Sequence, residues 1–206
     1  GLYNAYLSLK NSPEFATYSV AQKKAIENAL RDFELSGIGL SEEKQKRYGE
    51  IVARLSELSA QFSNNVLDAT MGWEKVIEDE SELAGLPESA LLAAKQSAES
   101  KGLKGYRFTL EIPSYLPIMT YCENAALREE MYRAYATRAS DQGPNAGKWD
   151  NTAIIEEIMT LRVELAKLLG FNTYTERSLA TKMAESPQQV LDFLNNLADR
   201  SKAKGE

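Results

Sequence analysis

The chain has 206 residues, of which 43% are apolar and 26% charged, and its formal net charge is −6. Its length and apolar content suffice for one large helical domain or two small ones with a real core. The acidic balance argues against nucleic acid as a partner, because such proteins need positive surface to neutralise phosphates. No stretch approaches the ~20 uninterrupted apolar residues of a membrane-spanning helix, so no membrane partner is expected either.

The sequence contains no histidine and one cysteine, Cys122. Histidine titrates near neutral pH and is the usual nitrogen ligand of catalytic zinc, so histidine-dependent triads and zinc sites are excluded within these residues. A lone cysteine excludes an internal disulfide and fits a reducing compartment such as the cytoplasm. Without a base to activate its thiol, Cys122 is expected to be a small core residue.

Capping residues and apolar periodicity predict helices in the first part of the chain. A short helix is expected over 2–9. Ser19 and Gln22 form a capping box, and the helix they begin should end before the glycines of 36–39. Ser41 can then cap a rod of ~40 Å that lasts to about Asp68. The apolar residues of this rod recur every three or four positions: Tyr48, Ile51, Val52, Leu55, Leu58, Phe62 and Val66.

Two segments rich in β-branched and aromatic residues, 71–77 and 106–112, interrupt the helical pattern. Alternation in the second segment predicts one buried face, made of Tyr106, Phe108, Leu110 and Ile112. Between the two segments, a helix is predicted with Pro87 at its first position and Gly102 at its end. We expect the strands to pair as a small antiparallel ribbon supported by this helix.

The rest of the chain has a helical pattern again. Asn124 can cap a helix that ends before the loop 141–147, and another helix is predicted over 150–169. Ser186 and Gln189 form a capping box for the last helix. The predicted fold class is mainly α, a multi-helix bundle with long antiparallel helices and a small two-stranded antiparallel β ribbon. We expect one helical, non-catalytic domain over 1–206.

No constellation of residues predicts a catalytic, cofactor-binding or metal site. The glycine-rich run 143–148 is one residue short of a phosphate-binding loop, and Trp149 stands where a serine or threonine must hold magnesium. As a calcium site the same loop lacks the required glycine and glutamate. Adjacent acidic residues point about 100° apart on a helix and are expected to be solvated. These acidic pairs are Glu42/Glu43, Glu129/Glu130 and Glu156/Glu157.

Aromatic residues offer a weaker hint of a binding surface. Four tyrosines could line a groove, although their helical spacing favours half-buried packing: Tyr115, Tyr121, Tyr132 and Tyr135. Trp73 and Trp149 could stack on a ligand, but packing is the commoner role of a tryptophan.

The run 162–174 and its continuation 178–187 resemble the thimet oligopeptidase family of zinc metallopeptidases. The segments 36–41, 55–65, 83–87, 113–115 and 128–138 agree, so the resemblance covers essentially the whole chain. It implies a cytoplasmic or organellar enzyme that cleaves short peptides in a deep channel between two mostly helical halves. It also implies a zinc ion held by a His-Glu-x-x-His helix and a later glutamate. This sequence contains no such helix, so no metal ligand or catalytic residue is carried over to it.

The resemblance therefore predicts an internal fragment that is inactive alone, with zinc confined to the full-length parent. Both ends of the chain lie within helical patterns, which agrees with an excised piece. Its expected role is architectural: the rod 41–68 and the helices after Asn124 would form much of one channel wall. Short peptides and the missing catalytic half are the expected partners. The alternative is a free-standing helical module that binds peptides or a protein without catalysis, and no His-Glu-x-x-His motif would follow such a module.

Overall fold

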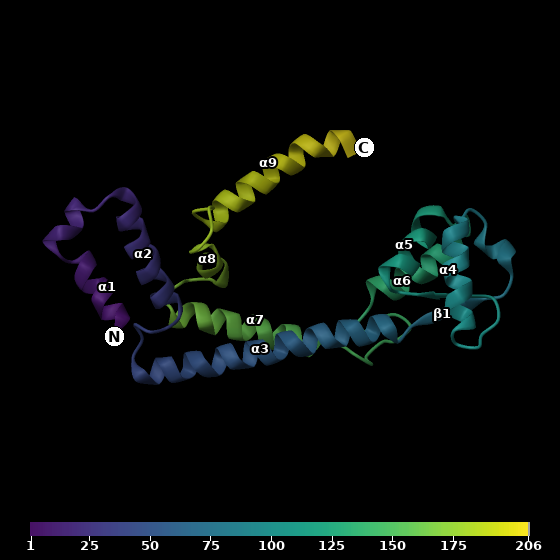
Figure 1. Cartoon of the computed structure of the whole chain (residues 1–206), viewed down its shortest axis with the longest axis horizontal. Coiled ribbons are helices and arrows are strands. Elements are labelled where there is room, and N and C mark those ends of the chain that lie inside the picture. Colours follow the sequence, from purple (N-terminus) through teal and green to yellow (C-terminus); the bar gives the residue numbers. More distant parts are fainter. Residues whose placement is uncertain (206) are drawn as a thin grey trace. The chain divides into compact units, whose positions relative to one another are not determined.

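The computed structural model describes residues 1–205 and is mainly helical, as predicted (Figure 1). Its α-helices are α1 (Leu2–Lys10), α2 (Val20–Leu35), α3 (Glu42–Met71), α4 (Glu88–Glu99), α5 (Ile112–Tyr121), α6 (Ala125–Ala136), α7 (Thr152–Leu168), α8 (Tyr174–Leu179) and α9 (Pro187–Gly205). Short 3-10 helices span Pro13–Thr17 and Glu80–Leu83. Two compact units divide the chain: unit 1 is Gly1–Ser56 with Ile158–Glu206, and unit 2 is Glu57–Glu157.

In unit 1, α1 and α2 form a helical hairpin around an aromatic contact. The rings of Tyr3 and Tyr6 lie 5.9 and 6.0 Å from the ring of Phe33. The predicted capping box at the start of α2 is confirmed in both directions. The Gln22 amide donates to the Ser19 hydroxyl over 3.3 Å, and the Ser19 amide donates to the Gln22 side chain over 2.9 Å. These bonds satisfy backbone donors that the first turn of a helix leaves free.

Unit 1 also contains the start of α3 and most of α7, which are joined by a forked ion pair. Arg47 donates from Nε and Nη2 to the two carboxylate oxygens of Glu164, over 2.6 and 2.8 Å. The guanidinium stabilises the charged carboxylate, and this lowers the pKa of Glu164 below its ordinary value. Buried apolar residues complete this part of the unit: Ile51, Leu161, Leu165 and Ala166.

Unit 2 contains the predicted antiparallel ribbon and a large core cluster of buried residues. Strand β1 (Glu74–Ile77) pairs with β2 (Tyr106–Thr109) in a register that places Glu74 opposite Thr109. Helix α4 packs against β2, and α5 packs against α6. The core cluster joins residues from all of these elements: Trp73, Ile77, Leu83, Leu86, Ala94, Phe108, Leu110, Ile118, Cys122, Leu127, Met131 and Ala134.

The strands are shorter than the predicted segments 71–77 and 106–112. Helix α3 runs on to Met71, and β2 ends at Thr109 because the chain turns into α5. The expectation that Ile112 shares the buried face of Phe108 is wrong, since Ile112 is 52% exposed. The carbonyl of Glu111 already accepts from the amides of Ser114 and Tyr115, which starts the helix.

Smaller differences concern helix starts. Pro87 is the N-cap of α4 and not its first residue, and α8 was not predicted as a separate helix. At α9 the Ser186 hydroxyl accepts the Gln189 amide as expected, but the Gln189 side chain accepts from Glu185 one residue earlier. No helix within residues 1–205 is long and apolar enough to cross a lipid bilayer.

Candidate functional site

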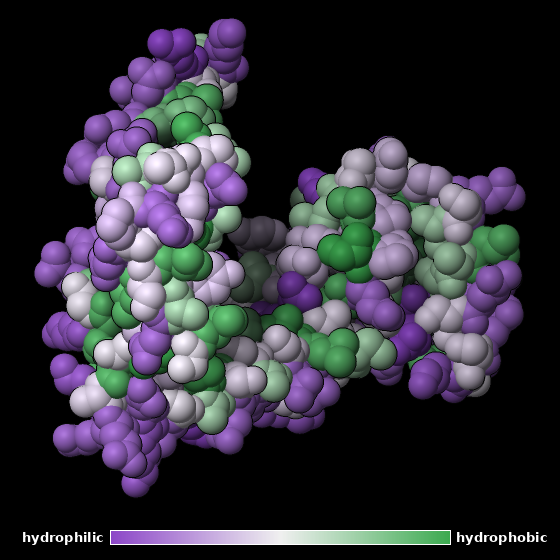
Figure 2. All heavy atoms as spheres, turned by 60° about the vertical axis from the view of Figure 1, so that its left-hand side comes forward, coloured by the Kyte–Doolittle hydropathy of each residue, from purple (hydrophilic) through white to green (hydrophobic). Residues whose placement is uncertain are grey.

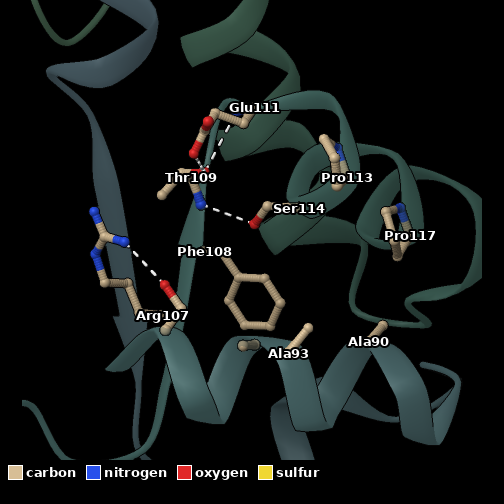
Figure 3. Close-up of a pocket in the computed structure, with 11 residues that line it drawn as sticks. Ala90, Ala93, Arg107, Phe108, Thr109, Glu111, Pro113, Ser114 and Pro117 are labelled. Atoms are coloured by element: carbon tan, nitrogen blue, oxygen red, sulfur yellow. Dashed lines mark hydrogen bonds between the residues drawn. The ribbon is translucent and has the colours of Figure 1, made fainter. Parts of the chain in front are cut away.

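A small hollow in unit 2 lies between helix α4, strand β2 and helix α5 (Figure 3). It has a volume of about 190 Å³. Its lining combines small apolar, aromatic and charged side chains: Ala90, Ala93, Ala94, Ser97, Arg107, Phe108, Thr109, Glu111, Pro113, Ser114 and Pro117.

All the α4 residues that line the hollow have small side chains. Ala90, Ala93, Ala94 and Ser97 recur at three- and four-residue steps, so they share one face of the helix. Helix α4 and β2 pack against each other, yet alanine and serine fill little of the space between them. The ring of Phe108 is 2% exposed and forms part of the apolar lining.

Arg107 provides the positive charge of this hollow, and its side chain is only 15% exposed. Its Nε donates to a carboxylate oxygen of Glu74 over 2.7 Å, and its Nη1 donates to the Ser97 hydroxyl over 2.9 Å (Figure 3). The guanidinium therefore joins both strands of the ribbon to α4. A partly buried charge needs such partners to offset the loss of water.

The opposite wall is set by the turn from β2 into α5. The Thr109 amide donates to the Ser114 hydroxyl over 2.9 Å. Because the amide of Thr109 points to Ser114 and not to β1, this end of the strand bonds to the helix. The Thr109 hydroxyl accepts from the Glu111 amide over 3.4 Å and lies 3.3 Å from the Glu111 carboxylate. The three polar residues therefore fix the turn, and Glu111 remains exposed at its rim.

The three hydroxyls that line the hollow, those of Ser97, Thr109 and Ser114, all accept hydrogen bonds within it. Ser114 is its one α5 hydroxyl, and that oxygen already accepts the Thr109 amide. The sequence contained only one sign of this hollow, the three- and four-residue spacing of small residues on α4. Which elements would face them could not be foreseen.

The loop 141–147 has the surface-turn structure expected for it. The amides of Ala146, Gly147 and Lys148 donate to carbonyls of Gly143, Ser140 and Asn145, over 3.3, 3.0 and 3.1 Å. Amides bonded within the loop are not free to surround a phosphate.

Among the four tyrosines singled out in the sequence, two pack and two are exposed. The rings of Tyr115 and Tyr135 stack at 4.2 Å, and burial raises the pKa of Tyr115. Tyr121 and Tyr132 are 54% and 59% exposed. The packing role expected of Cys122 is confirmed, since it is 3% exposed and its Sγ lies 3.7 Å from the Glu82 carbonyl.

The acidic pairs lie at the surface as expected, with Glu42, Glu43, Glu129, Glu130 and Glu156 exposed and Glu157 half-buried. Glu130 pairs with Lys75 at 2.9 Å. Within residues 1–205, no group of three or more cysteine, aspartate or glutamate side chains is arranged to hold a metal ion.

Comparison with known proteins gives the class of this chain. Residues 1–45 match the Neurolysin/Thimet oligopeptidase N-terminal domain, and residues 118–206 match Peptidase family M3. The chain belongs to this family of peptidases, as the sequence resemblance predicted. It is 86% identical over all 206 residues to Oligopeptidase A of Haemophilus influenzae and 70% identical to Oligopeptidase A of Escherichia coli.

A plant protein is a more distant relative of this chain. The chain is 44% identical over 204 residues to the Probable cytosolic oligopeptidase A of Arabidopsis thaliana. It spans only 30% of the length of the two bacterial relatives and 28% of the plant protein. The relatives therefore contain a large part to which nothing in this chain corresponds.

Proposed function

We propose that this chain forms part of the non-catalytic channel wall of a zinc-dependent metallopeptidase that hydrolyses short peptides in the cytoplasm. The names of its relatives, Oligopeptidase A and Probable cytosolic oligopeptidase A, support the substrate class and the compartment. The channel and the zinc ion follow from the family resemblance seen in the sequence.

The observation that carries the proposal is the match over the entire chain to oligopeptidases, in a sequence that has no histidine. Zinc in this family would need a His-Glu-x-x-His helix, and the residues present do not fit the ion. Hydrolysis would therefore depend on residues outside these 206, and the chain alone would be inactive. Its partners would be short peptides and the catalytic part of the same protein.

The wall role is supported by the helices themselves. Helix α3 has 30 residues without an internal proline, which gives a rod of ~45 Å. A channel that admits short peptides and excludes folded proteins needs rigid walls. Long, uninterrupted helices can form such walls when ion pairs between helices hold them, as the bidentate Arg47–Glu164 pair holds α3 to α7.

The proposal is tested by assaying the 206-residue chain and the full-length protein on a quenched short peptide, with and without a chelator. We expect turnover only from the full-length protein, with loss on chelation. Chelator-resistant turnover by the 206-residue chain would refute both the wall role and the assignment of chemistry elsewhere. A full-length sequence without His-Glu-x-x-His, combined with peptide binding but no hydrolysis, would favour the alternative of a free-standing binding module.

A further inference from the structure

Helix α9 has an apolar stripe whose large side chains are mostly exposed. None of its residues is buried, although its sequence has strong helical amphipathicity. Val190, Phe193, Leu194 and Leu197 follow three- and four-residue steps and therefore form one stripe, the α9 seam. Phe193, Leu194 and Leu197 are 67%, 51% and 52% exposed.

The polar residues of α9 lie on the other side of the helix. Asp192, Asn195 and Asp199 fall roughly 150–170° from the centre of the α9 seam at 100° per residue. Single apolar side chains are common on protein surfaces, and several are visible as green atoms in Figure 2. A contiguous stripe opposite a polar face differs from such scattered residues, because it has the pattern of a helix made to pack.

Local bonds hold α9 together at its start. The Ser186 hydroxyl accepts the Gln189 amide over 3.1 Å, and the Gln188 side chain donates to Asp192 over 2.7 Å. Helices in water draw most of their stability from an apolar face packed in tertiary structure. Capping preserves α9 as a helix, and its face remains available for a partner.

The comparisons indicate what that partner is. Helix α9 lies inside the block 118–206 that matches Peptidase family M3, whose bacterial members here are more than three times as long as this chain. A second copy of the chain is a poorer occupant. A stable interface between separate molecules needs ~1,000 Å² or more of buried surface, which one stripe of four side chains does not provide. A partner in the same polypeptide avoids most of the association cost.

We infer that the α9 seam is the surface on which the remaining, catalytic part of an M3 peptidase chain packs. The inference rests on the proposed function for the nature of the partner. It adds which helix face makes the contact, and it predicts that the same side chains are dispensable in the 206-residue chain and structural in the full-length protein.

The test is a substitution made in both proteins. Phe193→Asp places a charge in the α9 seam, so we expect it to lower the thermal midpoint of the full-length protein by at least about 5 °C. In the 206-residue chain Phe193 is largely in solvent, and we expect a change below about 1 °C. Asn195→Asp adds the same charge on the polar side of the helix and should leave both midpoints unchanged. If full-length F193D does not fold, Phe193→Ala replaces it, with a smaller loss expected in the full-length protein alone.

Two outcomes would overturn the inference. One is a full-length midpoint that F193D and F193A leave unchanged. The other is a dimer of the 206-residue chain that F193D dissociates while the full-length protein is insensitive, which would assign the seam to a second copy. Chelator-sensitive hydrolysis is measured separately on the unmodified full-length protein. The inference and the proposed function can therefore fail independently of each other.

Discussion

The two units are of similar length but bury their apolar residues very differently. Sixteen of the twenty-two buried apolar residues in the described chain lie in unit 2, and six lie in unit 1. Unit 2 closes a core between a ribbon and three helices, whereas α1, α8 and α9 of unit 1 have no buried residue. Amphipathic helices alone therefore do not form a core, because the apolar face of each helix must pack against the apolar face of another element.

The largest expected effect comes from removing a ring of the unit 2 core. Phe108→Ala should lower the free energy of unfolding by about 3–5 kcal/mol, since Phe108 is 2% exposed and a cavity would remain. Phe193→Ala in unit 1 removes the same atoms from a site that is 67% exposed. This substitution should change the free energy of unfolding by less than about 0.5 kcal/mol. Urea unfolding of the 206-residue chain measures both. Similar losses of unfolding free energy for the two substitutions would show that the two units do not differ in how they bury apolar residues.

A smaller effect is expected where the ribbon needs a glycine. Gly105 has φ +84°, and a Cβ there would lie 2.3 Å from the Ile77 carbonyl oxygen. Gly105→Ala should therefore cost at least about 2 kcal/mol in unfolding free energy, from backbone strain and a clash with backbone.

Gly102 is the matched control for this substitution. It has φ +67° but nothing within 4 Å of the added Cβ, so Gly102→Ala should show only the conformational cost of about 1 kcal/mol. Equal losses for the two variants in urea unfolding would mean that the close approach of Gly105 to β1 does not constrain the ribbon.

Next in size is the buried amide of unit 2. Asn151 is 2% exposed, donates to the Phe62 carbonyl over 3.2 Å and accepts from the Asn65 side chain over 2.8 Å. Asn151→Ala leaves these two groups without a partner and should cost about 1–3 kcal/mol in unfolding free energy. Hydrogen exchange of unit 2 amides detects the loss, and the exposed Asn195→Ala serves as control. Unchanged exchange would show that water replaces the amide.

The smallest effect concerns the exposed ion pair of unit 1. Glu164 has a lowered pKa in the folded chain, so its pairing with Arg47 stabilises the fold above the ordinary glutamate pKa of about 4.3. That contribution is lost as the pH falls through the lower, folded pKa. Because both side chains are more than a third exposed, Glu164→Gln should lower the thermal midpoint at pH 7 by less than about 2 °C.

The pH dependence separates this pair from the core of unit 2. The difference between the wild-type and E164Q midpoints should shrink toward zero as the pH is lowered through the acid range, because Glu164 then becomes neutral in both states. A constant difference down to pH 2 would assign the effect to packing and not to charge.

Residues close together in the sequence were enough to predict most helices. The features that were not predicted depend on packing between segments far apart in the sequence. The capping box at Ser19 and the periodicity of α3 depend on neighbours within a few residues, so both could be predicted from sequence. The end of β2 could not be predicted, because Ile112 continues the alternation and only the turn into α5 ends the strand. The hollow was out of reach for the same reason, since Arg107, Ser97 and Ser114 meet only after α4 and α5 pack.

Cys122 gives unit 2 a built-in reporter. It is the single thiol of the chain, and it belongs to the core cluster at 3% exposure. An alkylating reagent can reach its sulfur only when the helices around it separate. The rate of labelling therefore reports how often unit 2 opens. No residue has to be introduced for this purpose, and the motions of one unit can be timed while the other contributes no signal.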